Sequence, residues 1–314
     1  MTPPASPSPA DPSRYDVEAL RTRLRPHRDG RVDDSIPALA AADPDLCAIA
    51  LALPDGSVRG SAEAGVRVSV QSAVKPFLFA LALLDTDGGA LERVGIEPTG
   101  ESFDAITLET GTGRPPNPMV NAGALLTASL VDGTGPEGRM QRIAAGLAAF
   151  AGRELDVDDE VAHDEHLRGD RNHALAHLLR AEGVLDASAD DAVAVYARAC
   201  ATLVDAETLA IMGATLAGGG VNPRTGDRVI PARVARDVVS VMATCGMYDG
   251  SGRWMRAVGV PAKSSVSGGI VLAARGGLGA AIISPPLDAQ GTSVRGHVAS
   301  ELLSEDLGLH AFGG

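Results

Sequence analysis

The segment that decides the fold is "QSAVKPFLFALALLDTDGG", residues 71–89, in which a serine and a lysine precede a long apolar run. The apolar run from Phe77 to Leu84 predicts a buried helix, which the following "DTDGG" ends. Ser72 falls where this helix begins, and Lys75 follows one turn later. Both side chains are therefore expected to point from the same face of the helix.

Strand patterns occur toward both ends of the chain, with helical patterns between them. Residues 45–60, "DLCAIALALPDGSVRG", predict a β-hairpin with a Pro-Asp-Gly turn, and "VRVSV" predicts a further strand. Strand-like runs return in "SVSGGIVLAA" and "GLGAAIISPP", and a last helix is expected over about 293–306. This order predicts an α/β fold of the α+β type, with one sheet built from both ends of the chain and an inserted helical lobe over about 85–245.

Length, charge and apolar content restrict the class of protein. The 314 residues carry a formal charge of −13, and no basic stripe is visible, which argues against a nucleic-acid partner. The longest apolar run has nine residues, "PFLFALALL", too short to span a bilayer. Residues 1–14 predict a disordered Pro/Ser-rich tail that is no signal peptide, followed by a single domain over 15–314. We therefore expect a cytoplasmic protein with no membrane partner.

Lysine is unusually scarce in this chain. The sequence contains 25 arginines but only two lysines, Lys75 and Lys263, and both lie beside serines. A serine hydroxyl becomes a good nucleophile when a neighbouring base takes its proton, and a desolvated lysine can be that base because burial lowers its pKa. Arginine does not lose its proton usefully. The two surviving lysines are therefore candidates for catalytic groups.

The spacing of serine and lysine fits a known type of chemistry. S-x-x-K, followed much later by K-[ST]-G on a strand, is the signature of penicillin-recognising serine acyl enzymes. Here the second element is Lys263-Ser264-Ser265, which departs from that pattern by one residue. The alternative interpretation is a helix-capping serine with a solvated lysine, which the placement of both lysines disfavours.

Tyrosine and asparagine are also scarce, with three tyrosines and four asparagines. Tyr248, in "TCGMYDGSG", lies in a Gly-flanked loop where an aromatic ring is not expected to fill a core. Tyr196 lies on an apolar helix face, so its pattern alone predicts a core position.

Seven blocks in order along the chain resemble the serine-dependent glutaminase family: "QSAVKP", "NPMVNAGAL", "GDRN", "TLAGGGVNPRTGDRV", "CGMYDGSG", "GVPAKSSVSGGI" and "SPPLDAQGTSVRG". The resemblance implies a fold like that of serine β-lactamases, with a central, mostly antiparallel sheet flanked by helices. It also implies hydrolysis of L-glutamine to L-glutamate and ammonia, no cofactor, no metal, and a homodimer or homotetramer.

The resemblance also implies roles for individual residues. Ser72 would be the nucleophile that forms a γ-glutamyl ester, Lys75 its partner and Tyr248 a further proton-transfer group, with Lys263 completing the catalytic set. The substrate would be held by the remaining positions that match the family's motifs: Asn121, Glu165, Asn172, Tyr196 and, through its backbone in the oxyanion hole, Val266. Glu165 precedes Asn172 by seven residues, so a bent or broken helix is needed to bring both to one pocket.

One departure from the family pattern and three alternatives accompany this interpretation. A tyrosine usually precedes the Ile-Pro pair near the N-terminus of glutaminases, but this chain has Ser35 there, which predicts a gap in the pocket. The "HDEH" segment with His173 and His177 has an alternative interpretation as a zinc site, because i,i+4 histidines on a helix can chelate. The rival functions are a β-lactamase or peptidoglycan peptidase, and an inactive scaffold that binds a partner.

Overall fold

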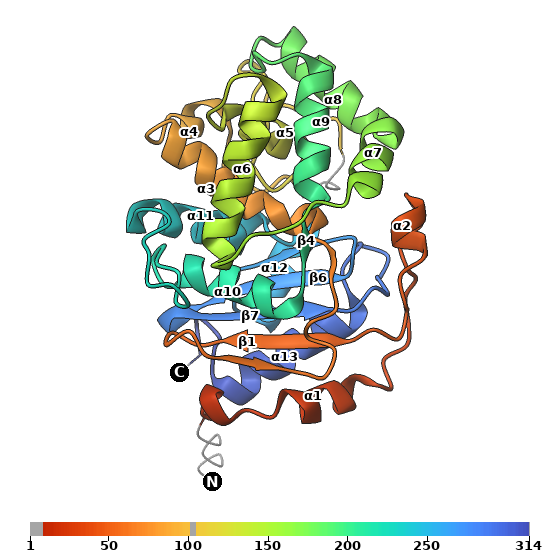
Figure 1. Ribbon diagram of the computed structural model, residues 1–314, viewed down its shortest axis with the longest axis vertical. Coiled ribbons are helices and arrows are strands. Elements are labelled where there is room, and N and C mark those ends of the chain that lie inside the picture. The colour runs from red at the N-terminus through yellow and green to blue at the C-terminus, as the bar shows by residue number, and fades with distance from the viewer. Residues whose placement is uncertain (1–8, 101–104, 314) are drawn as a thin grey trace.

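The computed structural model describes residues 9–100 and 105–313. In these residues a five-stranded antiparallel sheet has the order β2-β1-β7-β6-β5 (Figure 1). Its strands are β1 (Ala48–Ala52), β2 (Val58–Gly60), β5 (Ala262–Ser264), β6 (Gly269–Ala274) and β7 (Leu278–Ile283). The N-terminal hairpin β1–β2 pairs with the C-terminal strand β7, which confirms that both ends of the chain build one sheet.

The two faces of the sheet carry side chains of different size. In β1, Ala48, Ala50 and Ala52 point toward one core, whereas Ile49 and Leu51 point toward the other, as the two-residue period of a strand requires. The larger side chains pack with three helices, α1 (Val17–Leu24), α12 (Ser251–Ala257) and α13 (Val294–Leu307). Figure 1 shows α1 and α13 together on the lower side of the sheet.

Helix α10 (Ala206–Ala217) covers the opposite face, where alanines and glycines let its backbone approach closely. A Cβ added to Gly279 of β7 would lie 2.0 Å from the carbonyl oxygen of Ala210, and one added to Gly213 would lie 2.5 Å from that of Leu272. These residues of α10 fall inside the range predicted for the helical lobe. The structure places them in the layer against the sheet instead, because the small side chains create the room.

The remaining helices lie above α10 and beside it, as Figure 1 shows. They are α2 (Pro37–Ala40), α3 (Lys75–Asp85), α4 (Ala90–Arg93), α5 (Asn121–Leu130), α6 (Gly135–Ala151), α7 (Asp159–Arg168), α8 (Asp170–Ala181), α9 (Ala189–Cys200) and α11 (Ala232–Cys245). The segment "VRVSV" does form a strand, β3 (Val68–Ser69), but it pairs with β4 (Leu203–Val204) outside the main sheet.

The N-terminal segment is only partly described. Residues 1–8 of the predicted tail lie outside the described residues. Within the remainder of the tail, Pro12–Arg14 form a 3₁₀ turn, and the Ala10 N–H donates a hydrogen bond to the carbonyl of Asp306 at 2.8 Å. Among the described helices, not one combines the length and the apolar character that crossing a bilayer demands.

Candidate active site

Ser72 lies in a short 3₁₀ turn, η2 (Gln71–Val74), that runs directly into α3. The prediction that a regular helix begins at Ser72 is therefore displaced by one turn, because α3 starts at Lys75 with Pro76 in its first turn, where a missing N–H costs nothing. Gln71 has a left-handed φ of 49°, a conformation that a non-glycine residue adopts rarely and that recurs at functional sites. The Ser72 side chain is only 8% exposed.

Lys75 is fully buried, and its Nζ contacts two of the predicted site residues. It donates to Asn121 Oδ1 at 2.7 Å and to the hydroxyl of Tyr248 at 3.4 Å. A buried amino group needs such acceptors, because removing a polar group from water without them is costly. The interpretation of a solvated surface lysine beside a capping serine is therefore wrong for Lys75.

Lys263 is also fully buried and approaches the same tyrosine from the face of its ring. Its Nζ lies 3.8 Å from the ring centroid of Tyr248 and donates to the carbonyl of Ser264 at 2.7 Å. Burial, and then the charge of nearby Lys75, hold the pKa of Lys263 well below its usual range. Tyr248 itself has a φ of 53° and begins the turn η3 (Tyr248–Gly250).

Asn121 joins Lys75 to Asn172, one of the predicted substrate residues. Its Nδ2 donates to Asn172 Oδ1 at 3.0 Å, while its Oδ1 accepts from Lys75. Asn172 lies near the start of α8, and Glu165 lies in α7, with Gly169 between the two helices. The predicted break of the helix between Glu165 and Asn172 is thus confirmed.

Glu165 is half-buried and contacts Gln71, the residue that precedes Ser72. Burial raises the pKa of its carboxyl group, and a hydrogen bond with the side chain of Gln71 opposes that rise in pKa. The negative charges of Asp33 and Asp164 raise the pKa further. A carboxylate placed here can pair with the ammonium of an amino acid and would gain much from doing so.

Tyr196 on α9 is almost completely buried, as its apolar pattern predicts. Burial raises the pKa of its hydroxyl group well above the usual range, and further contributions come from Cys200, Tyr248 and Glu165. Tyr196 therefore lies in the core, within electrostatic reach of two other predicted site residues, Tyr248 and Glu165.

A cavity of about 840 Å³ opens beside Tyr248 and Val266. Its other walls come from residues 29–34 and 287–291 together with Asp249 and Val294. Val266 follows Ser265, whose hydroxyl donates to the carbonyl of Val70 at 2.9 Å. That bond ties the loop after β5 to the segment that carries Ser72.

Sequence reasoning did not single out two residues that lie at this site. Gln71 contacts Glu165 and precedes Ser72 in a left-handed conformation, and Asp33 lines the cavity and acts on the charge of Glu165. In the sequence, Gln71 could have been found because it directly precedes Ser72. Asp33 could have been found because it lies two residues before Ser35. Ser35 is exposed, and its hydroxyl and N–H both donate to the Asp33 carboxylate.

Comparison of this sequence and fold with known proteins finds glutaminases. The glutaminase family model matches residues 30–312. A glutaminase of Clavibacter michiganensis is 67% identical over 97% of this chain and 94% of its own length. The solved structure of Mglu in its glutamate form has a TM-score of 0.90 and 45% identity, covering 94% of this chain and 69% of that one. A probable glutaminase of Bacillus subtilis has a TM-score of 0.87 and 30% identity, covering 94% and 96%.

These similarities confirm the predicted mixed α/β architecture, an antiparallel sheet flanked by helices as in β-lactamase-like proteins. The family match spans nearly all of the described chain, including each of the predicted site residues. The chain therefore belongs to the glutaminase family of amidohydrolases.

Proposed function

We propose that the protein hydrolyses L-glutamine to L-glutamate and ammonia through a γ-glutamyl ester on Ser72. The observation that carries this proposal is the environment of Lys75, which is fully buried one turn after Ser72 and contacts both Asn121 and Tyr248. A lysine held in this way beside a buried serine is suited to move protons rather than to solubilise a surface.

In the acylation step the Oγ of Ser72 attacks the side-chain amide carbon of glutamine, and its proton passes to the amine of Lys75. The hydroxyl of Tyr248, 3.4 Å from Lys75 Nζ, supplies a route for that proton to the leaving nitrogen. The C–N bond breaks and ammonia leaves. Water then attacks the ester, its proton returns through the same groups, and glutamate and free Ser72 result.

The oxyanion of each tetrahedral intermediate needs two donors at fixed positions. We assign them to the backbone N–H groups of Ser72 and Val266. Ser72 lies at the start of a helical segment, where backbone N–H groups lack partners within the helix, and the Ser265–Val70 hydrogen bond holds the Val266 loop close to it. This arrangement supports the assignment.

The substrate's own charges select the remaining contacts. Glutamine carries an α-ammonium group, which we pair with Glu165, and an α-carboxylate, which needs neutral donors or a cation. Asn121, Asn172 and Tyr196 are the polar side chains assigned to hold the rest of the molecule. The structure of Mglu in its glutamate form is consistent with a pocket for an amino acid of this size.

The deciding experiment measures ammonia release from L-glutamine by the purified protein, alongside L-asparagine and a chromogenic cephalosporin. We expect turnover of glutamine, far slower turnover of asparagine and none of the cephalosporin. Hydrolysis of the cephalosporin without glutamine turnover would favour the rival β-lactamase activity. Absence of any turnover, with glutamine binding retained, would favour an inactive scaffold.

The acyl-enzyme is tested separately. The enzyme is mixed briefly with glutamine, quenched with acid and digested. Mass spectrometry should then find the mass of a γ-glutamyl group added to the peptide that contains Ser72. A cytoplasmic location and a homodimer or homotetramer remain predictions, and sedimentation analysis of the purified protein will measure the second.

A further inference from the structure

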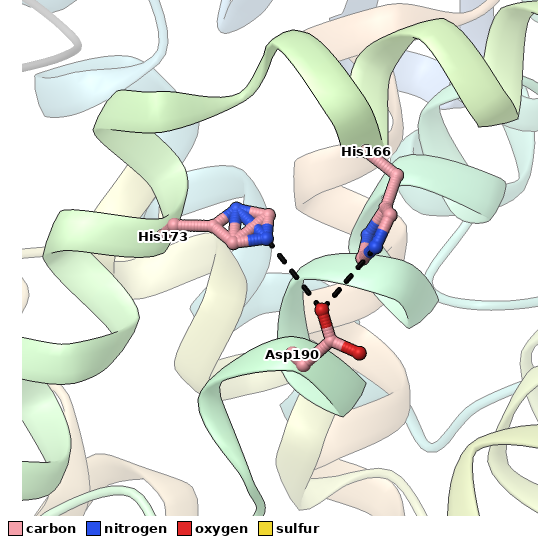
Figure 2. A group of neighbouring side chains, drawn as sticks. All are labelled: His166, His173 and Asp190. Atoms are coloured by element: carbon pink, nitrogen blue, oxygen red, sulfur yellow. Dashed lines mark ion pairs between the residues drawn. The ribbon is translucent and has the colours of Figure 1, made fainter.

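Away from the catalytic group, two histidines and an aspartate from three different helices converge. Figure 2 shows the rings of His166 on α7 and His173 on α8 directed at the carboxylate of Asp190, near the start of α9. His166 Nε2 lies 3.3 Å and His173 Nε2 lies 3.7 Å from Asp190 Oδ1. The three possible ligand atoms all lie within 4.8 Å of one another.

This group overlaps in part with the metal site that the sequence offered as an alternative. That alternative combined the "HDEH" segment, which contains His163 and His166, with His173 and His177; the exposed His163 and His177 are not part of the group, and Asp190 was not predicted. His166 and His173 are instead brought together across the break at Gly169. A seven-residue spacing across a broken helix is not a recognised chelating motif, so the sequence does not single out His166 and His173 from the other two histidines.

The tautomer of His173 argues for a cation between the rings and the carboxylate. Its Nδ1 lies 3.3 Å from the carbonyl oxygen of Gly169, and because a carbonyl can only accept, Nδ1 carries the proton. A neutral His173 then turns the lone pair of Nε2 toward a carboxylate oxygen, so two acceptors face each other unless a proton or a metal ion lies between them. Metal-binding histidines in proteins commonly use their second nitrogen in this way.

The spacing of the ligand atoms fits a small divalent ion. Zinc with bonds of about 2.0–2.1 Å holds tetrahedral ligands roughly 3.3–3.4 Å apart. The distance from Asp190 to His166 matches this spacing, and the distance to His173 exceeds it slightly. The side chain of Asp190 is 76% exposed, so its carboxylate has room to turn toward His173 and close the remaining gap.

We propose that His166, His173 and Asp190 form a zinc site that clamps α7, α8 and α9 together, with water as the fourth ligand. Each ligand is close in sequence to a residue assigned to the substrate. His166 follows Glu165, His173 follows Asn172, and Asp190 shares α9 with Tyr196. A bound ion therefore fixes the relative positions of the three helices that carry those groups.

The binding test uses protein freed of its affinity tag and treated with a chelator, then titrated with zinc chloride in a calorimeter. We expect one zinc ion per chain, with proton release and weaker binding as the pH falls. His166→Gln and His173→Gln should each weaken zinc binding at least about 100-fold, more than the loss of an outer partner costs. The matched controls His163→Gln on α7 and His177→Gln on α8, both exposed histidines, should bind zinc as the wild type does.

Two further readouts separate a site from loose surface binding. Cobalt(II) in place of zinc should give the intense visible absorption of tetrahedral coordination. Zinc at about 100 times its Kd should raise the Tm by about 4 °C in the wild type and both controls, and not in the two ligand variants. Absence of stoichiometric binding, or equal binding by the ligand variants, would overturn the site.

The clamp's effect on the substrate rests on the proposed function and is measured separately. We expect chelation to raise the KM for glutamine several-fold with little change in kcat, and added zinc to reverse this only where His166 and His173 are present. If zinc binds but KM does not respond, the coupling is refuted while the site stands. If glutamine is not a substrate at all, the calorimetry and cobalt spectra still decide the site.

Discussion

At the scale of single residues, two buried lysines approach one tyrosine from different directions. Lys75 contacts the hydroxyl of Tyr248, and Lys263 lies over the face of its ring. The charge of Lys75 is one reason why the pKa of Lys263 is lowered. The ring of Tyr248 therefore contacts both amines, with its centroid 3.8 Å from Lys263 Nζ and 5.2 Å from Lys75 Nζ.

Replacing Ser72 with alanine, or Lys75 with arginine, should abolish glutamine turnover without unfolding the protein. The first change removes the nucleophile, and we expect kcat to fall more than about 10⁴-fold. The second keeps the positive charge but removes a base that can give up its proton, with an expected loss of about 10²–10⁴-fold. Steady-state ammonia assays and circular dichroism measure both. Near-normal kcat in Lys75→Arg would reduce that lysine to an electrostatic role.

Glu165→Gln should raise the KM for glutamine about 10- to 100-fold and change kcat much less, because a charge pair with the substrate's ammonium exists in both ground and transition states. Since the pKa of Glu165 is raised, its ionised form is lost as the pH falls through a value above the ordinary range for glutamate. Wild-type KM should therefore rise on the acid side, and KM of Glu165→Gln should not. Parallel pH profiles of KM for the two enzymes would contradict this assignment.

Tyr248→Phe and Ser35→Tyr test whether Tyr248 transfers protons here, or whether that role needs a tyrosine at position 35. Tyr248 contacts Lys75, so its loss should collapse kcat by about 10²–10⁴-fold. Ser35 is exposed and bonded to Asp33, and we expect Ser35→Tyr to change KM modestly. A large rise in kcat for Ser35→Tyr would show instead that this chain lost a catalytic group at that position.

At the scale of elements, a helix or strand could be predicted from the sequence where neighbouring residues determine it, and could not where distant residues do. The β1–β2 hairpin follows from its turn residues, and the break between Glu165 and Asn172 follows from their spacing once the family resemblance assigns both to one pocket. Strand β5 has only three residues, and the position of α10 depends on Gly279 in the distant strand β7 as well as on its own Gly213. The Asp190 contact joins three consecutive helices, α7, α8 and α9, but it depends on how those helices pack against one another, and no periodic pattern encodes such a contact.

The contact between α10 and β7 makes a testable contrast between two glycines. Gly279→Ala would place a methyl group 2.0 Å from the Ala210 carbonyl oxygen, so it should lower the free energy of unfolding by about 1–3 kcal/mol or more. Gly138→Ala in α6 meets no atom closer than 3.6 Å and should raise the free energy of unfolding by about 0.5–1 kcal/mol through helix propensity. Urea unfolding of both variants measures the difference; a neutral Gly279→Ala would show that α10 can shift.

At the scale of the whole molecule, the N-terminal segment is fastened to the C-terminal helix. The Tyr15 hydroxyl donates to Asp306 Oδ2 at 2.6 Å, and Arg23 reaches the same oxygen at 3.1 Å. Burial and the hydrogen bond to Asp306 raise the pKa of Tyr15, so this tyrosine keeps its proton and its bond. None of the predicted site residues takes part in these contacts.

Tyr15→Phe should therefore lower the free energy of unfolding by about 1–2 kcal/mol, because Asp306 loses a donor, while kcat/KM for glutamine stays unchanged. Urea unfolding and the ammonia assay measure the two quantities on the same preparation. Arg14→Ala is the control, since Arg14 pairs only loosely with Asp11 at 3.8 Å on the surface. Loss of activity in Tyr15→Phe would mean that this end of the chain reaches the active site.

The pairing of β1 with β7 also sets an order of events during synthesis. Ala48 pairs with Ile283, so the β1–β2 hairpin leaves the ribosome long before the strand that covers its inner edge exists. At about 5–20 residues per second, that edge waits roughly 10–50 s for its partner. An apolar strand edge that stays exposed for this long can pair with other nascent chains. The yield of native enzyme should therefore depend on translation speed and on chaperones that bind the hairpin.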